Sequence, residues 1–315
     1  MNTTSMWGDK PYYSLDYYLK ERFGEKIYKI ALDVNMTCPN RDGTLDTRGC
    51  IFCSAGGSGE LAAKYHPNIG TQIENGIASY TRKEIGNRYI AYFQSYTNTY
   101  APIPTLRSLY RDALSHPKVV GISIATRPDC LGEDVLHLLA ELQQEFPHQI
   151  IWVELGLQTI HEKTATYIRR GYSLPVFTKA VEQLAKIRIP IVVHTILGLP
   201  FETTRDILAT IHYLNTLPIM GIKLQLLHVL EGTDLASAYY NKEFTCMTLE
   251  EYITLLLQCI EHLSPQIVIH RITGDGPKEL LIAPTWSLGK RTVLNTTHNT
   301  MKRNHLYQGR LYNGS

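Results

Sequence analysis

Short apolar segments rich in β-branched residues alternate along this chain with segments of helical periodicity, and this alternation limits the folds it can adopt. Seven segments are predicted to be strands, at residues 26–37, 88–97, 119–127, 150–159, 190–199, 221–230 and 266–275. Several are apolar almost throughout, which is typical of parallel strands covered on both faces. Six helices are predicted between them, at residues 71–85, 104–115, 132–146, 173–187, 203–216 and 248–263. The pattern therefore predicts one α/β domain with a parallel sheet.

Polar residues cluster near the carboxyl ends of these predicted strands, and their placement separates the possible α/β folds. They are Cys38, Gln94, Ser95, Thr126, Arg127, Glu154, Gln158, His194, Gln225, His228 and Arg271. Polar side chains that converge at one end of every strand are typical of a barrel active site. A doubly wound open sheet is the alternative, but neither GxGxxG nor GxxxxGK followed by Ser or Thr comes after any strand. We therefore expect a partial or full barrel.

Local signals place the starts of two helices and suggest one more at the N-terminus. Thr203 stands three residues before Asp206, and Thr248 is followed by Glu250 and Glu251. A threonine hydroxyl can accept a hydrogen bond from a backbone N–H group of the first helical turn, and acidic side chains are favourable there. Residues 11–24, which are rich in tyrosine, are expected to form an amphipathic helix that covers the barrel.

Three cysteines directly after the first predicted strand carry most of the functional information. Cys38, Cys50 and Cys53 have the spacing C-x11-C-x2-C. Three thiolates can hold a [4Fe–4S] cluster by three irons and leave the fourth iron open to a small molecule. A zinc site is an alternative, with His66 completing a set of three cysteines and one histidine. A redox CxxC motif is another alternative, although the loop lacks the strand–helix context that such a motif usually has.

The sequence predicts a cytoplasmic protein with no membrane partner. No apolar run reaches the ~18 residues of a spanning helix, and residues 1–14 contain no signal-peptide core. Thiols stay reduced in the cytoplasm, so clustered cysteines there indicate metal binding or catalysis more than disulfides.

Five motifs, in order along the chain, carry a family resemblance. They are ISIATRPD (122–129), WVELGLQT (152–159), RRGYS (169–173), VVHTILGLPFET (192–203) and LQLLHVLEGTDLA (224–236). Together with the cysteine motif they resemble the radical SAM superfamily, and within it the YhcC/YtqA-type bacterial proteins and the radical SAM portion of the Elongator catalytic subunit. The resemblance implies a partial (β/α)6-type radical SAM barrel at residues 26–280. Two small extensions are then expected, a helical one at residues 1–25 and a basic one at 281–315.

The same resemblance implies a set of cofactors and site residues. Cys38, Cys50 and Cys53 would hold a [4Fe–4S] cluster whose open iron binds S-adenosylmethionine (SAM). An external electron donor of the flavodoxin or ferredoxin type would then trigger SAM cleavage to a 5′-deoxyadenosyl radical that abstracts a hydrogen atom from the substrate. The residues implied to contact SAM are Gln94, Ser95, Arg127, Glu154, Gln158 and Gly198. No catalytic side chain is assigned.

Alternatives and departures accompany these assignments. Glu154 could instead pair with Arg127 or His194 inside the barrel, and Arg127 could pair with Asp129. The first cysteine gap is much longer than the common C-x3-C of the superfamily, so residues 39–49 must fold back to bring Cys38 beside the other two cysteines. The Gly-Gly-Glu often found after the second strand of the family is also missing from this chain.

The substrate implied by the resemblance is tRNA, modified on a carboxymethylaminomethyl-type side chain at C5 of the wobble uridine. The end of the chain fits a nucleic-acid partner, because no acidic residue follows Glu279 while five basic residues do: Lys290, Arg291, Lys302, Arg303 and Arg310. Trp286 and Tyr307 could stack on bases. A helix packed across the barrel is the alternative role for this segment. A radical SAM enzyme with a small-molecule substrate and a non-catalytic iron–sulfur or zinc protein that binds RNA are the alternative functions.

Overall fold

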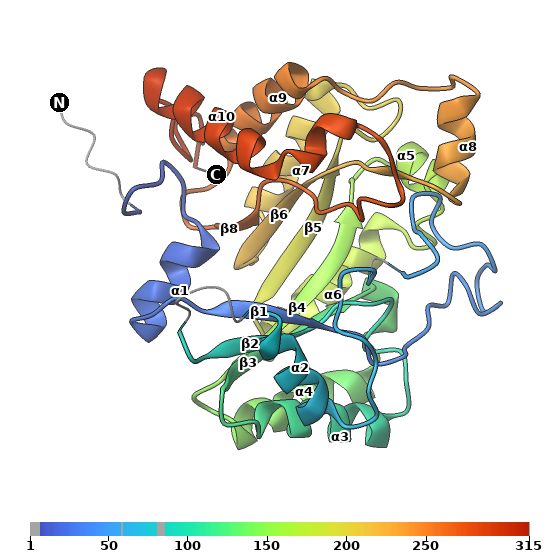
Figure 1. Ribbon diagram of the computed structural model, residues 1–315, viewed down its shortest axis with the longest axis vertical. Coiled ribbons are helices and arrows are strands. Elements are labelled where there is room, and N and C mark those ends of the chain that lie inside the picture. The colour runs from blue at the N-terminus through green and yellow to red at the C-terminus, as the bar shows by residue number, and fades with distance from the viewer. Residues whose placement is uncertain (1–6, 58, 81–85, 315) are drawn as a thin grey trace.

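The chain folds around one curled parallel sheet (Figure 1). The computed structural model describes residues 7–57, 59–80 and 86–314. Seven strands pair in parallel in the order β1-β2-β3-β4-β5-β6-β8. They are β1 (Tyr28–Leu32), β2 (Tyr89–Phe93), β3 (Val119–Thr126), β4 (Ile150–Gln158), β5 (Ile191–Leu197), β6 (Gly221–Leu226) and β8 (Val268–Arg271). Each lies within a segment predicted to be a strand, and the curled sheet is the predicted partial barrel.

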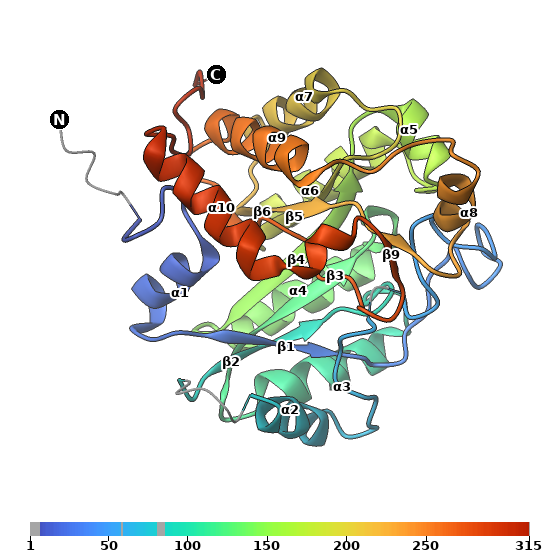
Figure 2. The ribbon, with the colours of Figure 1, turned by 45° about the horizontal axis from the view of Figure 1, so that its top comes forward.

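The helices that connect these strands cover the convex face of the sheet (Figure 2). They are α2 (Ile69–Ala78), α3 (Ile103–Leu114), α4 (Glu133–Glu145), α6 (Leu174–Lys186), α7 (Thr204–Asn215) and α9 (Leu249–His262). All six predicted helices are thus confirmed. The one predicted for 71–85 ends at Ala78, and residues 81–85 lie outside the described part of the chain. None of the helices described by the structure is long and apolar enough to cross a membrane.

The predicted helix starts at Thr203 and Thr248 are confirmed by their hydrogen bonds. The hydroxyl of Thr203 accepts from the N–H of Asp206 at 3.3 Å, and the hydroxyl of Thr248 accepts from the N–H of Glu251 at 3.2 Å. In both cases the acidic side chain accepts in return from the backbone N–H of the threonine. These capping boxes satisfy N–H groups that would otherwise lack a partner at the helix start.

Several short elements were not predicted. They are the helices α5 (Glu162–Tyr167) and α8 (Asp234–Tyr240), the 3-10 turns η1 (Pro128–Cys130) and η2 (Thr285–Leu288), and the strand β9 (Leu281–Ala283), which pairs antiparallel with β7 (Val229–Leu230) at the end of the predicted strand 221–230. Each is at most seven residues long, which is too short for hydrophobic periodicity to mark it.

The strands β1 and β8 form the two edges of the curled sheet, and the N-terminal segment runs along β8. The N–H of Ile269 donates to the carbonyl of Tyr13 at 2.7 Å, and Ser14 caps the helix that follows, α1 (Leu15–Phe23). This helix confirms the prediction for residues 11–24. The C-terminal helix α10 (Lys290–Arg303) lies alongside α9 (Figures 1 and 2). The region between α1, β1, β8 and α10 is called the seam below.

The C-terminal segment packs into the core through its own apolar residues. Val293 and Met301 of α10 are fully buried against it. The indole N–H of Trp286 donates to the carbonyl of Met247 at 2.9 Å, and its ring is half-buried. The ring of Trp286 is therefore engaged in packing, and α10 is a helix packed on the core, while contact of this segment with RNA stays a prediction. Tyr307 remains exposed. The domain boundaries at residues 25 and 280 stay a prediction.

Candidate active site: a cavity lined by three cysteines

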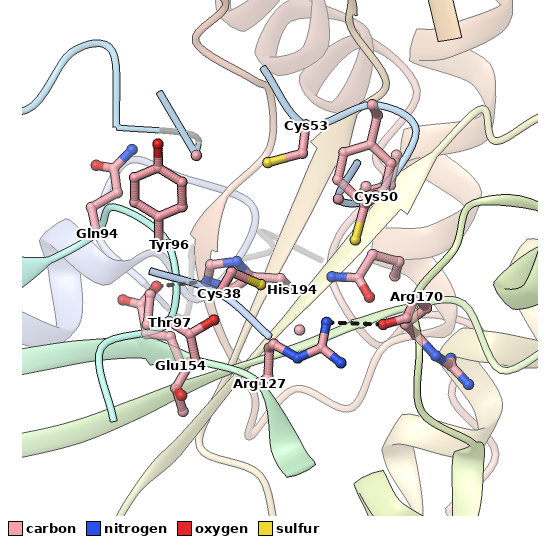
Figure 3. Close-up of a pocket in the computed structure, with 18 of the residues that line it drawn as sticks. Cys38, Cys50, Cys53, Gln94, Tyr96, Thr97, Arg127, Glu154, Arg170 and His194 are labelled. Carbon is pink, nitrogen blue, oxygen red and sulfur yellow. Dashed lines mark hydrogen bonds and ion pairs between the residues drawn. The ribbon is translucent and has the colours of Figure 1, made fainter. Parts of the chain in front are cut away.

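The loop after β1 folds back and brings the three cysteines to one cavity of about 200 Å³ at the carboxyl ends of the strands. The N–H of Gly49 donates to the carbonyl of Asn40 at 2.7 Å, which closes the long gap in the cysteine motif. The side-chain amide of Asn40 lies 3.5 Å from the sulfur of Cys50. In Figure 3 the thiols of Cys38, Cys50 and Cys53 surround a common space. The fold-back expected for residues 39–49 is therefore present.

The electrostatic setting of the cysteines combines burial with a nearby cation. Burial raises the pKa of the Cys50 thiol to about 12. Burial also raises the pKa of Cys53, an effect that the guanidinium of Arg41 opposes. Arg41 is fixed there because its Nη2 donates to the carbonyls of Cys53 and Ser54, each at 2.6 Å. Metal ligation requires thiolates, so iron binding at this site would release protons.

The zinc alternative loses its proposed fourth ligand. His66 does not line the cysteine cavity. It is partly buried, and its Nδ1 accepts from the N–H of Asn68 at 3.0 Å. Within residues 7–57, 59–80 and 86–314, no group of three or more histidine, cysteine, aspartate or glutamate side chains is arranged to hold a single metal ion. The donor set at the cavity is instead three thiols supplied by one loop, which fits a cluster bound by three cysteines.

Arg127, one of the predicted SAM contacts, lies on the wall of the cavity beneath the cysteines (Figure 3). Its Nε and Nη2 donate to the carboxylate of Asp129 at 2.9 and 2.7 Å, and its Nη1 donates to the carbonyl of Arg170 at 3.1 Å. The guanidinium also stacks on the ring of Tyr172 at 4.9 Å. The alternative pairing with Asp129 is thus observed, and it holds a rigid cation beside the thiols.

Glu154 on β4 is fully buried at the centre of the half-barrel. One oxygen accepts from Lys29 and Ser123, both at 2.6 Å, and the other accepts from His194 at 2.6 Å and from Lys223. Burial alone would raise the pKa of Glu154, but the ammonium groups of Lys223 and Lys29 hold it well below its usual value. Pairing with His194 is therefore observed and pairing with Arg127 is not. Contact with SAM stays a prediction.

The other predicted SAM contacts divide into two groups. Gln94 and Gln158 line the cysteine cavity, and the hydroxyl of Tyr172 donates to Gln158 at 3.3 Å. Ser95 and Gly198 are not on its wall. Gly198 has a φ of 87°, and a Cβ placed on it would lie 3.5 Å from the sulfur of Met247. The structure thus brings Gln94 and Gln158 together with the cysteines, whereas Ser95 and Gly198 lie elsewhere.

Three interior residues were missed by the sequence reasoning: Lys29 on β1, Tyr92 on β2 and Lys223 on β6. The ammonium of Lys223 donates to the hydroxyl of Tyr92 at 3.1 Å, and burial lowers the pKa of Lys223 to about 7. In the sheet register Lys223 lies between His194 and Arg271. A signal was available, because a lysine inside an apolar parallel strand requires a partner in the barrel interior.

Comparisons with known proteins agree with this geometry. Residues 47–214 match the radical SAM superfamily, and residues 219–303 match the Radical_SAM C-terminal domain. Cys50 and Cys53 lie inside the first match, and Cys38 lies before it. The solved structure of Elp3 from Methanocaldococcus infernus, with an N-terminal deletion, superposes with a TM-score of 0.67 at 16% identity. The match covers 90% of this chain and 64% of that one, and it shows a shared fold.

Two bacterial relatives match over most of their length, and an archaeal relative matches over part of its length. Protein YtqA of Bacillus subtilis is 41% identical over 304 residues, which cover 96% of this chain and 94% of YtqA. Protein YhcC of Escherichia coli K12 is 35% identical over 268 residues, 85% of each chain. The tRNA uridine(34) acetyltransferase of Methanocaldococcus jannaschii is 24% identical over 168 residues, 52% of this chain and 30% of that protein. On the superfamily match and the relatives of similar length, this chain belongs to the radical SAM superfamily.

Proposed function

We propose that the protein is a radical SAM enzyme that modifies the C5 side chain of the wobble uridine in tRNA. The observation that carries the radical SAM part is the meeting of Cys38, Cys50 and Cys53 at one cavity in a chain of this superfamily. With a [4Fe–4S] cluster and SAM bound, such a site supplies a 5′-deoxyadenosyl radical when an external donor of the flavodoxin or ferredoxin type delivers an electron.

The chain's own residues orient SAM and shield it from water. Arg127 presents a cation that Asp129 and Arg170 hold in place, suited to a carboxylate. Gln94 and Gln158 offer amide groups on the same wall, suited to the amino and ribose hydroxyl groups. Arg41 donates a hydrogen bond to the carbonyl of Cys53 and so holds the cysteine loop in place over the cavity.

The tRNA part of the proposal is supported by the surface at the seam. A cavity of about 460 Å³ opens there, and it is lined by five basic residues and one acidic residue. The basic residues are Lys10, Lys26, Lys29, Arg271 and Lys290, and the acidic residue is Asp16. On the adjoining helix α10, Arg291, Lys302 and Arg303 are exposed. The outer cations of this surface, on Lys10, Lys26, Lys290 and α10, can neutralise phosphates of a nucleic acid, and the archaeal relative described above is a tRNA uridine(34) acetyltransferase.

The first test measures the cluster and its chemistry. We expect protein reconstituted anaerobically to hold about four irons per chain and to form 5′-deoxyadenosine from SAM under reductant. Cys38→Ser should lose iron and SAM cleavage. Cys130→Ser is the matched control, because Cys130 lies outside the cavity. One zinc per chain without SAM cleavage would overturn the proposal.

The second test identifies the substrate class. Nucleosides from the tRNA of cells with and without the protein should differ at the modified wobble uridine. The change should return when the wild-type chain is restored and should not return with Cys38→Ser. An unchanged profile of wobble uridines would contradict the tRNA assignment and favour a small-molecule substrate.

A further inference from the structure

Three cavities follow one another from the seam to the cysteines. The seam cavity, described above, shares Leu15, Lys29, His270 and Arg271 with an inner cavity of about 230 Å³. The inner cavity in turn shares Tyr92, Gln94, Lys223 and Arg271 with the cysteine cavity. The three cavities are therefore neighbours that share wall residues, and the volume of the inner cavity suits a small group rather than a polynucleotide.

The wall between these cavities carries more cations than the carboxylates beside it neutralise. Four cationic side chains share two carboxylates there: Lys29, Lys223, Arg271 and Lys290, with Glu154 and Asp275. Lys29 and Lys223 both pair with the single carboxylate of Glu154. The only other acidic residue among those described on the inner wall is Glu60, whose carboxylate accepts from the hydroxyl of Ser54. Two buried lysines thus share Glu154, and Arg271 and Lys290 share Asp275. An anion bound at this wall would therefore add a counter-charge for its cations and would favour the protonated form of Lys223, whose pKa burial lowers to about 7.

These cations also retain hydrogen-bond donors. An ammonium has three N–H donors. Within the described residues, Lys29 donates to Glu154 at 2.6 Å and Ser123 at 3.3 Å, and Lys223 donates to Glu154 and to Tyr92 at 3.1 Å. Each lysine therefore has one donor left. Arg271 contacts Asp275 through one nitrogen at 3.3 Å, which leaves most of its five donors for a ligand.

We propose that Lys29, Lys223 and Arg271 bind the carboxylate of the substrate's reacting side chain. This assignment rests on the wobble-uridine function proposed above, and it makes the substrate class a uridine whose C5 side chain ends in an acid. Lys29 lines the seam and inner cavities and does not line the cysteine cavity. Lys223 and Arg271 line both the inner and the cysteine cavities, so the subsite adjoins the cavity where Arg127 would meet the carboxylate of SAM, and Lys29 marks its far side. A carboxylate held by Lys223 keeps the rest of the side chain next to the cysteine cavity.

Binding of modified RNA to the anaerobically reconstituted protein tests this subsite without turnover. Two anticodon stem-loops differ only at the end of the carboxymethylaminomethyl group of the wobble uridine, which is a free acid in one and the carboxamide in the other. We expect the wild-type protein to bind the acid at least about tenfold more tightly, as for hydrogen bonds to a charged group. Lys29→Met should remove most of this preference, and Arg271→Gln provides a second variant on a different strand.

Lys20→Met is the matched control, because Lys20 is an exposed lysine of α1 that pairs with Asp16 and lines none of the three cavities. It should keep the full preference for the acid, and Lys29→Arg should restore part of it. Equal affinity of the wild-type protein for acid and carboxamide would overturn the subsite while leaving the tRNA function intact. If neither modified stem-loop binds better than unmodified RNA, the proposed substrate itself is wrong. If Lys29→Met lowers the affinity for all stem-loops equally, Lys29 binds backbone phosphates. If it weakens only the binding of SAM, Lys29 binds SAM. Either result overturns the proposal.

Discussion

Removal of the buried carboxylate of Glu154 should strongly destabilise the protein. In Glu154→Gln the side chain keeps its shape, but Lys29 and Lys223 lose the anion that both of them contact. The exposed fractions of the two lysine side chains are 18% and 6%, so water cannot replace that anion fully. Removing one partner of a buried ion pair costs about 3–5 kcal/mol because the remaining charge stays buried.

The loss can be measured by thermal and urea unfolding of the cluster-free protein. With an unfolding entropy of about 2.1 cal/mol/K per residue, the 315 residues give about 0.7 kcal/mol/K. The expected loss therefore lowers the melting temperature by roughly 5–8 °C. Glu141→Gln is the control, because Glu141 pairs with Arg107 at 2.6 Å with 55% of its side chain exposed. Such a surface pair contributes about 0–1 kcal/mol.

A double variant separates loss of the ion pairs from general damage to the fold. Adding Lys223→Met to Glu154→Gln removes one of the two uncompensated charges. We expect it to restore at least about 1 kcal/mol of the free energy of unfolding, within the range of coupling energies between contacting residues. A Glu154→Gln protein that melts within about 1 °C of the wild type would refute the reasoning. A double variant less stable than the single one would show that the lysines are held by packing instead of by charge.

Three further substitutions test local features of the fold. Thr248→Ala removes the capping box of α9 and should lower the free energy of unfolding by about 1 kcal/mol in urea denaturation. Gly171→Ala places a Cβ 2.6 Å from the amide oxygen of Asn40 at a φ of 82°. It should therefore destabilise the protein more than Gly24→Ala, because Gly24 has a similar φ of 73° but open space around it. Equal losses of stability would mean that only backbone strain matters. Burial lowers the pKa of His194 from 6.5 to about 4, so the unfolded chain binds the proton first and stability falls as the pH drops from 6.5 towards 4. His194→Gln should flatten that fall by up to about 1.4 kcal/mol per pH unit, and an unchanged slope in unfolding experiments across this range would contradict the assignment.

The fold could be predicted from sequence because its strands are buried on both faces. Segments such as VVGISIAT on β3 leave no polar face, and all eight residues are buried in the structure. Polar residues at the strand ends then indicated that these strands curl towards a common centre. The short elements α5 and α8 could not be predicted, because they cap loops whose conformation depends on tertiary contacts such as the bond from the N–H of Leu235 to the carbonyl of Ile51.

The site could be predicted only in part, and the reason differs between its two halves. The cysteines and Arg127 lie in motifs that are continuous in sequence, so their neighbours along the chain identify them. Of the partners of Glu154, His194 was predicted and is observed, whereas the two lysines were missed. Arg127 and His194 were considered because they belong to the polar residues near the carboxyl ends of the predicted strands, whereas Lys29 and Lys223, which also hold Glu154, were not among those residues.

The curvature of the sheet explains why those lysines meet. In the strand order, β1 lies three positions from β4 and β6 lies two positions from it. At about 4.8 Å per strand, a flat sheet would place β1 roughly 14 Å from β4, which is too far for Lys29 to reach Glu154 across the intervening strands. The observed separation of 2.6 Å between Lys29 Nζ and Glu154 Oε1 therefore requires a curled sheet. The same curl directs Tyr92, His194 and Lys223 into the interior. The charged centre is thus a product of the barrel geometry. A substrate anion could bind there only because the curl of the sheet brings these cations together.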